Sequence, residues 1–384
     1  MKKLFFACML AFIAVFALVG CQPKDGGDSK YKVAMVTDYG DITDQSFNQA
    51  TYEGCKDWCD ANKVDFKYYK PATNSDDDRI ASTKQAIADG YNVIVMPGYA
   101  FAPTIEATAT KYPDVHFIAL DVALGDLLAA HFENYDYNPE NPSWASYQLP
   151  SNVYCAVYQE EIAGFFAGYA AVKEGFTKLG FLGGMSVPAV VRYGYGFVQG
   201  ADKAAQEMNV EISINYVYGG QFFGDADITA VMDTWYNGGT EVVFACGGGI
   251  FTSAGEAAKK VNKYVIGVDV DQKPTIDGQY GAGMTVTSAM KGLYATVQSA
   301  LTALIKEDKF VSKVDTLGLV SKTDVEKNYV QLPVKTWSMT HFTVDQYKAL
   351  VGQVFDGTVA VSNQIANHPT VSAKTTVNYQ ADIK

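Results

Sequence analysis

The chain is poor in the residues that build metal and redox centres. It has six cysteines and four histidines in 384 residues, and no CxxC pair occurs. The histidines lie too far apart along the chain for metal-ligand spacing, at positions 116, 131, 341 and 368. The sequence therefore predicts no metal site and no cofactor. Apart from two cysteines near the start, we expect the others to be buried apolar side chains, with a disulfide left open: Cys55, Cys59, Cys155 and Cys246.

Positive charge is also scarce. Lysine and arginine together number 30 against 42 acidic residues, which gives a net charge of −12. Nucleic-acid binding needs clustered basic residues, so nucleic acid is excluded as a partner. The same acidity disfavours adhesion to anionic lipid headgroups.

Signs of an enzyme are missing as well. No GxSxG nucleophile motif occurs. Asp38, Asp41 and Asp44 superficially resemble an Asp-rich metal loop, but Tyr-Gly and Ile-Thr interrupt them, and no second acidic cluster stands out. We therefore expect a protein without catalytic activity.

Long apolar runs are absent except at the start of the chain. Lys2 and Lys3 precede an apolar run from Leu4 to Val19, which is typical of a secretory signal and shorter than the ~20 residues of a membrane-spanning helix. Leu18-Val19-Gly20-Cys21 resembles the bacterial lipobox, so residues 1–20 are predicted to be cleaved and Cys21 to carry lipid. The alternatives are an uncleaved anchor helix or an ordinary signal peptide.

Residues 21–30 are polar and contain Gly and Ser, which predicts a flexible tether. Without residues 1–20, which contribute two lysines and no acid, the net charge becomes 28 − 42 = −14. The expected product is an exported, acidic, lipid-anchored protein facing the periplasm or the cell exterior.

From Tyr31 onward, short apolar runs alternate with longer amphipathic segments. This βαβ rhythm predicts parallel sheets covered by helices. Strands are expected at 31–37, 64–69, 91–96, 115–120, 178–182, 210–217, 241–246, 264–270, 284–287, 317–320 and 329–332. Helices are expected at 46–62, 76–89, 103–112, 160–173, 190–208, 226–236, 253–262, 291–306 and 344–355. Ser46 and Gln49 have the spacing of a capping box.

Two segments break this rhythm. Residues 123–150 are rich in proline and aromatic residues and are too irregular for an ordinary connection, so we interpret them as an insertion or flap beside a lobe boundary. The segment from residue 358 to 384 is polar and poorly periodic. Two α/β units of similar size, followed by a smaller remainder, indicate two lobes.

In open parallel sheets, ligands bind beyond the carboxyl ends of the strands. The first such loop ends in Asp44, Ser46, Phe47 and Asn48. An aromatic ring beside an amide suits a flat heterocycle with polar edges. The alternatives are that Asp44 and Ser46 only cap the following helix and that Phe47 belongs to its core face.

Other strand ends carry further candidates. Asp121 and Asp269 end buried strands, where an acid is costly unless it is paired or bonded. Gly247, Gly248 and Gly249 offer close backbone approach, or simply a tight turn. Lys291 is predicted at a helix N-terminus, against the helix dipole, which makes it a functional candidate. Asp269 and Lys291 could together hold vicinal hydroxyls. Arg192 and Tyr193 begin another helix.

Five segments, taken in order, resemble the basic membrane protein family: TDYGDITDQSFNQATYEG, GFLGGMSVPAVVRYGYGFVQGA, FACGGG, VIGVDVDQ and TSAMKG. The likeness spans roughly residues 31–340. It implies a lipoprotein of an ABC importer with a type I periplasmic-binding-protein fold, in which two Rossmann-like lobes with parallel sheets are joined by a three-crossing hinge. It further implies a purine nucleoside ligand, a membrane permease as partner and a monomer.

The resemblance also implies roles for individual residues. Phe47 would stack on the base, with Asn48 and Asp121 at its polar edge and Asp44 beside them. Glycines 247–249 would line the sugar side, and Asp269 and Lys291 would hold the ribose hydroxyls. A second stacking ring remains open among Tyr193, Phe222 and Phe223. The chain departs from the family at Tyr193, where Phe is usual, in the longer 123–150 segment and in the tail.

The resemblance also sets the expected lobe boundaries. We expect lobe 1 at 31–122 and 283–317, lobe 2 at 155–272 and 325–357, an insertion or hinge region at 123–154 and a polar tail at 358–384. The three crossings are expected near 122–155, 272–283 and 317–325. A sugar or other solute receptor or sensor of the same fold remains the alternative function, and a nucleoside hydrolase is the enzymatic one.

Overall fold

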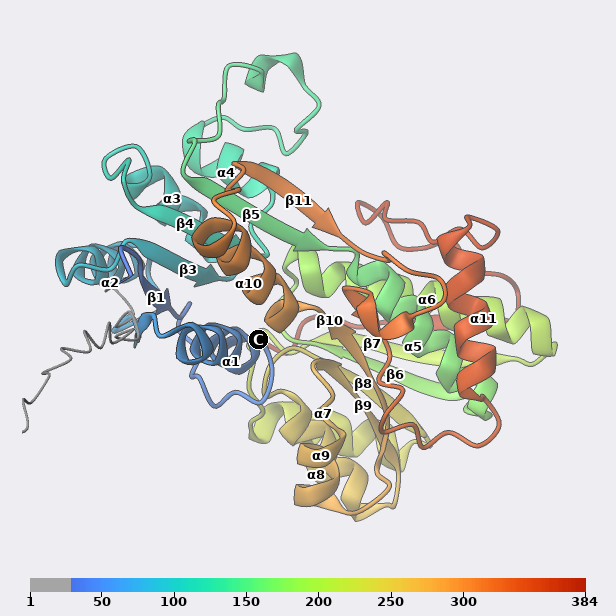
Figure 1. Cartoon of the computed structure of the whole chain (residues 1–384). Coiled ribbons are helices and arrows are strands. Elements are labelled where there is room, and N and C mark those ends of the chain that lie inside the picture. Colours follow the sequence, from blue (N-terminus) through green and yellow to red (C-terminus); the bar gives the residue numbers. More distant parts are fainter. Residues whose placement is uncertain (1–28) are drawn as a thin grey trace, which may run out of the picture.

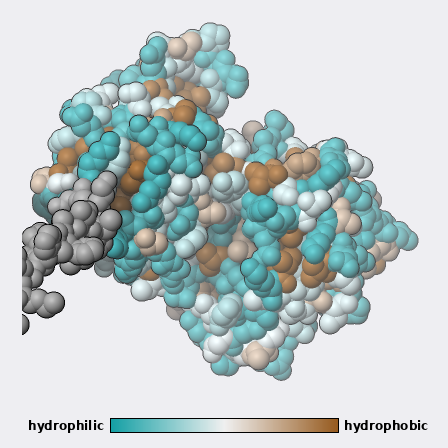
Figure 2. Space-filling view, viewed as in Figure 1, coloured by the Kyte–Doolittle hydropathy of each residue, from teal (hydrophilic) through white to brown (hydrophobic). Residues whose placement is uncertain are grey.

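The computed structural model describes residues 29–384 and consists of two parallel sheets with helices on both faces of each (Figure 1). The predicted signal peptide, the lipidation site at Cys21 and nearly all of the tether lie outside these residues. No helix within residues 29–384 has the length and apolar character needed to cross a bilayer. The face shown in Figure 2 is largely hydrophilic, with apolar residues in small separate patches.

The first sheet has six parallel strands. In spatial order they are β11 (Lys313–Leu317), β5 (Val153–Tyr158), β4 (His116–Leu120), β3 (Val93–Pro97), β1 (Lys32–Val36) and β2 (Asp65–Tyr69). One face packs on α2 (Asp76–Ala88), α3 (Ala102–Thr108) and α4 (Leu124–His131), and the other on α1 (Phe47–Asn62) and α10 (Leu293–Leu301). The inner strands β1, β3 and β4 are almost entirely buried because both faces are covered, whereas the edge strands β2 and β11 carry polar, exposed residues.

The second sheet has seven strands. In spatial order they are β12 (Val330–Gln331), β10 (Thr285–Lys291), β9 (Tyr264–Asp269), β8 (Val242–Cys246), β6 (Lys178–Gly183), β7 (Ile212–Tyr218) and β13 (Thr375–Tyr379). All pairs are parallel except β10 with β12. One face packs on α5 (Glu160–Glu174) and α6 (Pro188–Met208), and the other on α7 (Ala226–Asn237), α8 (Phe251–Lys260) and α9 (Lys273–Tyr280).

The remaining elements are short or peripheral. They are 3-10 turns at Tyr99–Phe101, Pro142–Trp144 and Val325–Lys327, a π-helical turn at Thr302–Lys306 that continues α10, and the helix α11 (Val344–Phe355). The predicted α/β fold with parallel sheets is confirmed.

Two strands belong to the other lobe from the one we expected. β5 lies in the first sheet, although residues from 155 on were assigned to lobe 2, and β10 lies in the second sheet, although 283–317 was assigned to lobe 1. The chain thus crosses between the lobes after Tyr158, after Lys291 and after Leu317. β5 was not predicted as a strand, and the strand expected at 284–287 continues to Lys291. Even where an apolar run predicts a buried strand, it does not encode which sheet the strand joins.

α5 and α6 lie unusually close together because glycines on each helix face the backbone of the other. A Cβ on Gly164 or Gly168 would collide with the carbonyl groups of Tyr193 and Phe197, and a Cβ on Gly196 would collide with the backbone of Glu161. Side chains at these positions would push the helices apart. The contact brings the first turns of both helices to the interlobe boundary.

The two irregular segments differ from their predicted roles. Residues 132–150 precede β5 and therefore lie at the amino edge of the first sheet, where they project from the end of the lobe and not beside the lobe boundary (Figure 1). Trp144 Nε1 and Asn141 Nδ2 donate to Asp136 within this loop, at 2.8 and 2.6 Å. The tail is not merely a polar extension, because its residues 375–379 form β13, an edge strand of the second sheet.

The four internal cysteines are buried, as predicted, and they are free, which answers the question of a disulfide that the sequence left open: Cys55, Cys59, Cys155 and Cys246. Burial raises the pKa of the Cys55 and Cys246 thiols well above the ordinary value. They pack as small apolar groups.

Candidate ligand-binding site

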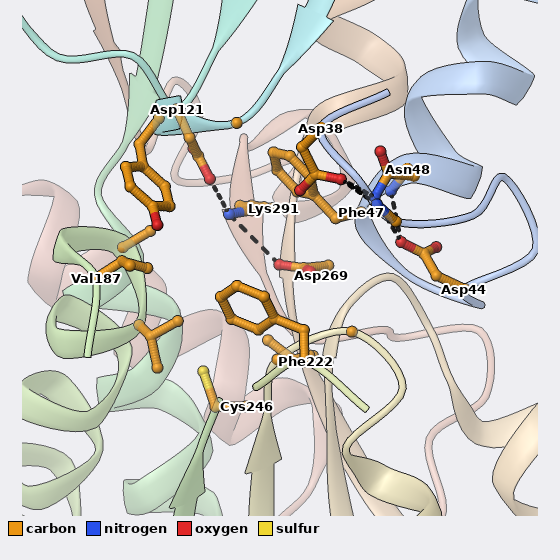
Figure 3. A pocket seen from close by; sticks show the side chains of 18 of the residues that line it. Asp38, Asp44, Phe47, Asn48, Asp121, Val187, Phe222, Cys246, Asp269 and Lys291 are labelled. Carbon is orange, nitrogen blue, oxygen red and sulfur yellow. Dashed lines mark hydrogen bonds and ion pairs between the residues drawn. The ribbon is translucent and has the colours of Figure 1, made fainter. Parts of the chain in front are cut away.

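A cavity of about 420 Å³ lies between the two sheets, at the carboxyl ends of their strands (Figure 3). This volume is within the range of sites for small organic ligands. All ten residues predicted from the sequence line it: Asp44, Phe47, Asn48, Asp121, Tyr193, Phe222, Gly247, Gly248, Asp269 and Lys291. The parallel strands explain the convergence, since their carboxyl ends meet at one edge of each sheet.

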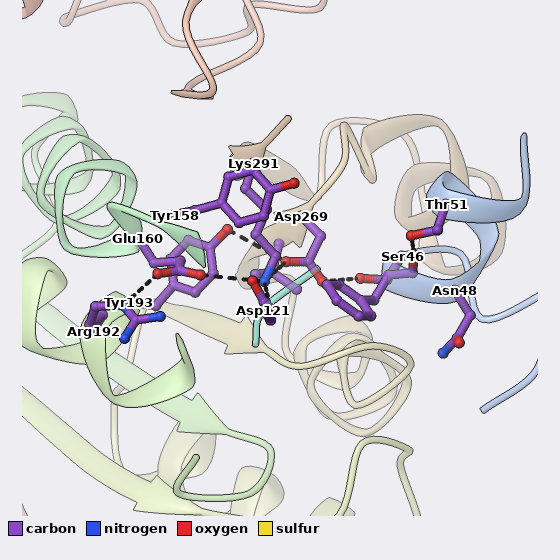
Figure 4. A network of polar contacts seen from close by, with 12 residues as sticks. Ser46, Asn48, Thr51, Asp121, Tyr158, Glu160, Arg192, Tyr193, Asp269 and Lys291 are labelled. Carbon is purple, nitrogen blue, oxygen red and sulfur yellow. Dashed lines mark hydrogen bonds and ion pairs between the residues drawn. The ribbon is translucent and has the colours of Figure 1, made fainter. Parts of the chain in front are cut away.

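Lys291 lies at the centre of the site and is buried (Figure 4). Its ammonium nitrogen is 2.6 Å from Asp121 Oδ2, 3.5 Å from Asp269 Oδ1 and 3.6 Å from Glu160 Oε1. Burial opposes the charge of Lys291, but the carboxylates of Asp121, Asp269 and Glu160 outweigh it and raise the pKa above the ordinary lysine value. Lys291 is the last residue of β10 and not the first of a helix, so a strand end and not a helix dipole positions it.

Asp121 and Asp269 hold equivalent positions in the two lobes. Each follows or ends a central strand, β4 or β9, and each has a left-handed backbone, with φ of 59° and 65°. Aspartate tolerates this region better than most residues, but the conformation is still uncommon. Such local strain concentrates at ligand sites, where it aims a side chain that a regular strand would turn away.

Glu160 and Arg192 extend the charge network, and sequence reasoning missed the first of them. Arg192 Nε donates to Glu160 Oε2 at 2.6 Å, and Glu160 is fully buried (Figure 4). Burial raises the pKa of Glu160, and Arg192 and Lys291 counter that shift. The available signal was the pair of acids Glu160-Glu161 opening a helix that is otherwise apolar.

Asp44 caps α1, as the simpler interpretation proposed. Its carboxylate accepts hydrogen bonds from the backbone N–H groups of Ser46, Asn48 and Gln49, at 2.8 to 3.0 Å. Burial nevertheless raises its pKa, and these N–H groups oppose the rise.

The predicted capping box is wrong. Ser46 makes no side-chain cap; its hydroxyl instead donates to Asp269 Oδ2 at 2.7 Å, from one lobe to the other. Asp44 takes over the N–H groups that Ser46 would have capped, which frees the serine for this contact.

Asn48 and Asp121, which line the cavity, each have a fully buried side-chain oxygen. Asn48 Nδ2 donates to Asp38 and Asp44, at 3.2 and 3.1 Å, which fixes the amide. Within residues 29–384, neither Asn48 Oδ1 nor Asp121 Oδ1 has a hydrogen-bond partner. An unpaired buried acceptor costs about 1–3 kcal/mol. These two oxygens are therefore acceptors suited to N–H or O–H groups of a ligand.

Phe47 and Phe222 line the cavity from opposite lobes, and Tyr39 and Tyr99 of the first lobe also line it. Phe47 comes from the start of α1, and Phe222 comes from the loop after β7 and points into the cavity (Figure 3). The ammonium of Lys291 is 4.7 Å from the Phe47 ring centre, within cation–π distance. Phe223 lies at the rim and is 56% exposed.

Tyr193 also lines the cavity, but its ring is part of the core. It is 1% exposed, packs edge-on against Phe244, and its hydroxyl is 3.5 Å from Asp269 Oδ1. Among the three candidates for a second stacking ring, the geometry therefore favours Phe222.

The glycines after β6 and β8 make room for Phe222. A Cβ on Gly247 would lie 2.8 Å from Cδ1 of the ring, and one on Gly184 would also collide with it. Gly249 N donates to the Phe222 carbonyl at 2.8 Å. Gly184 was not predicted as part of the site. The feature that could have indicated it is the Gly-Gly pair at the end of β6. Gly247 lies against the ring, and Gly248 lies against the carbonyl group and Cβ of Phe222.

Acids outnumber cations around the cavity. The lining has six aspartates (Asp38, Asp41, Asp44, Asp121, Asp126 and Asp269) but one lysine and one arginine, Lys291 and Arg192. Burial raises the pKa of Asp126 to about 6. Both cations are already engaged by carboxylates, so a phosphate-bearing ligand would meet net repulsion. Within residues 29–384, no group of three or more acidic, cysteine or histidine side chains is arranged to hold a metal ion.

The sequence model of the family described as "ABC transporter substrate-binding protein PnrA-like" matches residues 31–354. The chain is 28% identical to the ABC transporter nucleoside-binding protein BmpA of Lactococcus lactis, over 71% of this chain and 75% of the relative. It is 27% identical to basic membrane protein B of Borreliella afzelii, over 68% and 72%.

Among solved structures, a solute-binding protein of an ABC transporter system from Aeropyrum pernix superposes with a TM-score of 0.64. The two chains are 18% identical, and the superposition covers 86% of this chain and 87% of that one. At this identity the likeness supports the fold alone. The family match, which spans most of the chain, supports more: this protein belongs to the PnrA-like family of ABC transporter substrate-binding proteins.

Proposed function

We propose that this chain is the lipid-anchored receptor of an ABC importer and that its cavity binds purine nucleosides, namely inosine, guanosine and adenosine. The observation that carries the proposal is the pairing of Phe47 and Phe222 across the cavity, next to the buried Asp121–Lys291–Asp269 cluster. Two rings suit a flat base, and the charged cluster suits the hydroxyl groups of a ribose. The Lactococcus lactis relative, which is named a nucleoside-binding protein, supports this ligand class.

The unpaired acceptors suit a purine. Asn48 Oδ1 and Asp121 Oδ1 would accept hydrogen bonds from the N–H groups at the edge of the base. Asp269 would accept from a ribose hydroxyl and Lys291 would donate to one. Stacking on aromatic rings contributes about 1–3 kcal/mol per base and tolerates different bases. Several purines are therefore expected to bind.

The acidic lining supports a nucleoside and not a nucleotide. A phosphate would be placed near six aspartates, and the two nearby cations already form ion pairs. We infer that a 5′-phosphate weakens binding strongly.

Contacts between the lobes support ligand capture by hinge closure. The Ser46 hydroxyl donates to Asp269 Oδ2 at 2.7 Å, Gln272 Nε2 donates to the Gln45 carbonyl at 3.0 Å and Thr275 Oγ1 donates to Gln45 Oε1 at 2.9 Å. In the proposal these contacts form on closing, and the closed receptor, a monomer, delivers its ligand to a membrane permease.

The anchor completes the proposed receptor. Lipid on Cys21 would hold it at the membrane, and more than one acyl chain is needed because a single chain binds only marginally. Residues 22–30 would act as a leash of about 9 residues between the lipid and the first strand. Replacing Cys21 by Ser should move the protein from the membrane fraction to the soluble fraction.

Isothermal titration calorimetry tests the ligand class. Inosine, guanosine and adenosine should bind, whereas free ribose and inosine 5′-monophosphate should bind weakly or not at all. Phe47→Ala and Phe222→Ala should each weaken binding, and Phe355→Ala, an exposed ring on α11, serves as the control. Tight binding of ribose alone would favour a sugar receptor, and release of ribose from inosine would favour a hydrolase. Either result would contradict the proposal.

A further inference from the structure

The segment 375–384 is built into the second lobe, although it lies beyond residues 31–354, which the family's sequence model matches. Its first half is β13, parallel to β7, with Thr375 opposite Ile212 and Tyr379 opposite Tyr216. The pairing then continues past the strand. Gln380 N donates to the Tyr216 carbonyl and Ile383 N to the Tyr218 carbonyl, both at 2.9 Å. The segment therefore follows β7 to its carboxyl end, where the loop 219–225 begins.

Lys384 contacts that loop directly, and Ile383 anchors the segment beside it. Ile383 packs against the apolar cluster beneath α7 and α8. Lys384 forms an ion pair with Asp225 and lies 3.5 Å from Asp227. A Cβ on Gly220 would be 2.9 Å from both the Cβ and the carbonyl oxygen of Lys384, so backbone lies against backbone here. Figure 1 marks this end of the chain with C.

Asp225 connects these contacts to α7 and to the loop. It is the N-cap of α7, and its Oδ1 accepts from Ile228 N at 3.0 Å. Its Oδ2 accepts from Gln221 Nε2 at 2.7 Å as well as from Lys384. The helix N–H group, Lys384 and Gln221 hold the pKa of Asp225 at about 2. One carboxylate thus joins the segment, the helix and the loop.

The loop carries Phe222 into the cavity. It contains Gly219, Gly220 and Gly224. Glycine residues have more accessible backbone conformations than other residues, so ordering this loop costs more conformational entropy. On its cavity side it is held by Gly249 N, which donates to the Phe222 carbonyl at 2.8 Å. On its outer side it is held by Lys384, through the ion pair with Asp225 and the close approach to Gly220.

We propose that the segment 375–384 is a strap that positions Phe222, and thereby sets the affinity of the cavity for the flat ring of its ligand. The effect on affinity rests on the proposed function, because it assumes a purine nucleoside ligand. The ordering of the loop by the segment does not depend on that ligand. A loop fixed before binding does not have to be ordered by the ligand, so affinity rises with the fraction of molecules in the competent conformation. Lys384, Ile383 and Asp225 are positioning residues in this scheme, and Phe222 contacts the ligand.

Two perturbations test the strap. Lys384→Met removes the ion pair and keeps much of the side-chain length, and deletion of residues 380–384 removes Ile383 as well while leaving β13. Lys384→Arg should restore the ion pair, and Lys348→Met, at an exposed lysine of α11, is the matched control. Amide hydrogen exchange across residues 219–225 and calorimetry with inosine are measured on each purified protein, and thermal unfolding verifies folding.

Exchange in the loop should accelerate in Lys384→Met, more so in the deletion, and remain at the wild-type rate in Lys384→Arg and Lys348→Met. Inosine affinity should fall about 3- to 10-fold in Lys384→Met, because the competent loop becomes less populated. In a Phe222→Ala background the same substitution should cause no further loss. A purely structural role would weaken both backgrounds equally.

The outcomes separate the two proposals. If the wild type binds no purine nucleoside but loop exchange responds as described, the ligand assignment is overturned and the strap stands. If the wild type binds inosine while loop exchange is unchanged in the deletion, the strap is overturned and the ligand assignment stands. An equal loss of affinity with and without the Phe222 ring would also overturn the strap.

Discussion

Replacing Lys291 by Met should destabilise the closed structure more than any other single change to the charge network. The side chain keeps a similar length and loses only its charge and donors. Its ammonium is within 3.6 Å of three buried carboxylates, Asp121, Asp269 and Glu160, and the first is at 2.6 Å. Without the ammonium, these acids face one another in a poorly hydrated site.

The magnitude follows from these distances. With an effective dielectric constant of about 20, each attraction amounts to about 5–6 kcal/mol before the loss of hydration is subtracted. Burying an ion costs several kcal/mol, so most of this attraction is offset. Breaking a buried pair from one side costs about 3–5 kcal/mol net. For a chain of this length, that corresponds to a fall in Tm of roughly 4 to 7 °C.

The loss should depend on pH. Burial already raises the pKa of Glu160, and removing Lys291 raises it further. An acid whose folded pKa lies above its unfolded value favours folding at low pH, and this contribution is lost as the pH rises through the folded pKa. The deficit of Lys291→Met should therefore be largest near about pH 8 and shrink toward about pH 5.

The loss of stability at each pH is measured by thermal and denaturant unfolding. The proteins compared are the wild type, Lys291→Met and the control Lys348→Met. Equal stability of Lys291→Met and wild type at the higher pH would refute the assignment of Lys291 as the counter-ion of the cluster. A deficit of equal size at both pH values would refute the explanation by unpaired carboxylates.

Three further predictions concern ligand binding, titration and packing. Phe47→Ala and Asp269→Ala should each weaken inosine binding by about 10- to 100-fold in calorimetry, from lost stacking and a lost acceptor; wild-type affinity in both would refute the site. Burial raises the pKa of Glu161 to about 7, from 4.5, so stability should fall as the pH rises between these values. Glu161→Gln should flatten that part of the unfolding profile, and an unchanged slope would exclude this group. Gly164→Ala should cost about 1–3 kcal/mol or more, because its Cβ meets the Tyr193 backbone; an unchanged Tm would mean the helices separate freely.

The sequence predicted the residues that line the cavity better than it predicted the assignment of strands to the two lobes. Asp121 and Asp269 were found because each lies at the end of an apolar run, and strand ends converge in parallel sheets. Lys291 was chosen as a cation at an expected helix N-terminus, but it lines the cavity because it ends β10. β5 was missed altogether, because it directly follows the irregular segment that ends at residue 150. The sheet of β10 was missed because an apolar strand carries no record of its neighbours.

Other features depend on long-range partners. Ser46 has the spacing of a cap, but its hydroxyl bonds Asp269 in the other lobe, and no local pattern shows that. Glu160 was missed because an acid at a helix start is usually a cap or a solvated residue, whereas here it is fully buried against Arg192. The tail was interpreted as polar because β13 is an edge strand with exposed side chains, which leaves a weak apolar pattern.

A crystal structure of the protein grown with a purine nucleoside such as inosine would show directly whether and how the cavity binds this ligand. We predict that the base lies between the rings of Phe47 and Phe222 and that the ribose hydroxyls lie against Asp269 and Lys291. A nucleoside bound outside this cavity, or one whose ribose and not its base lies between the rings, would contradict it.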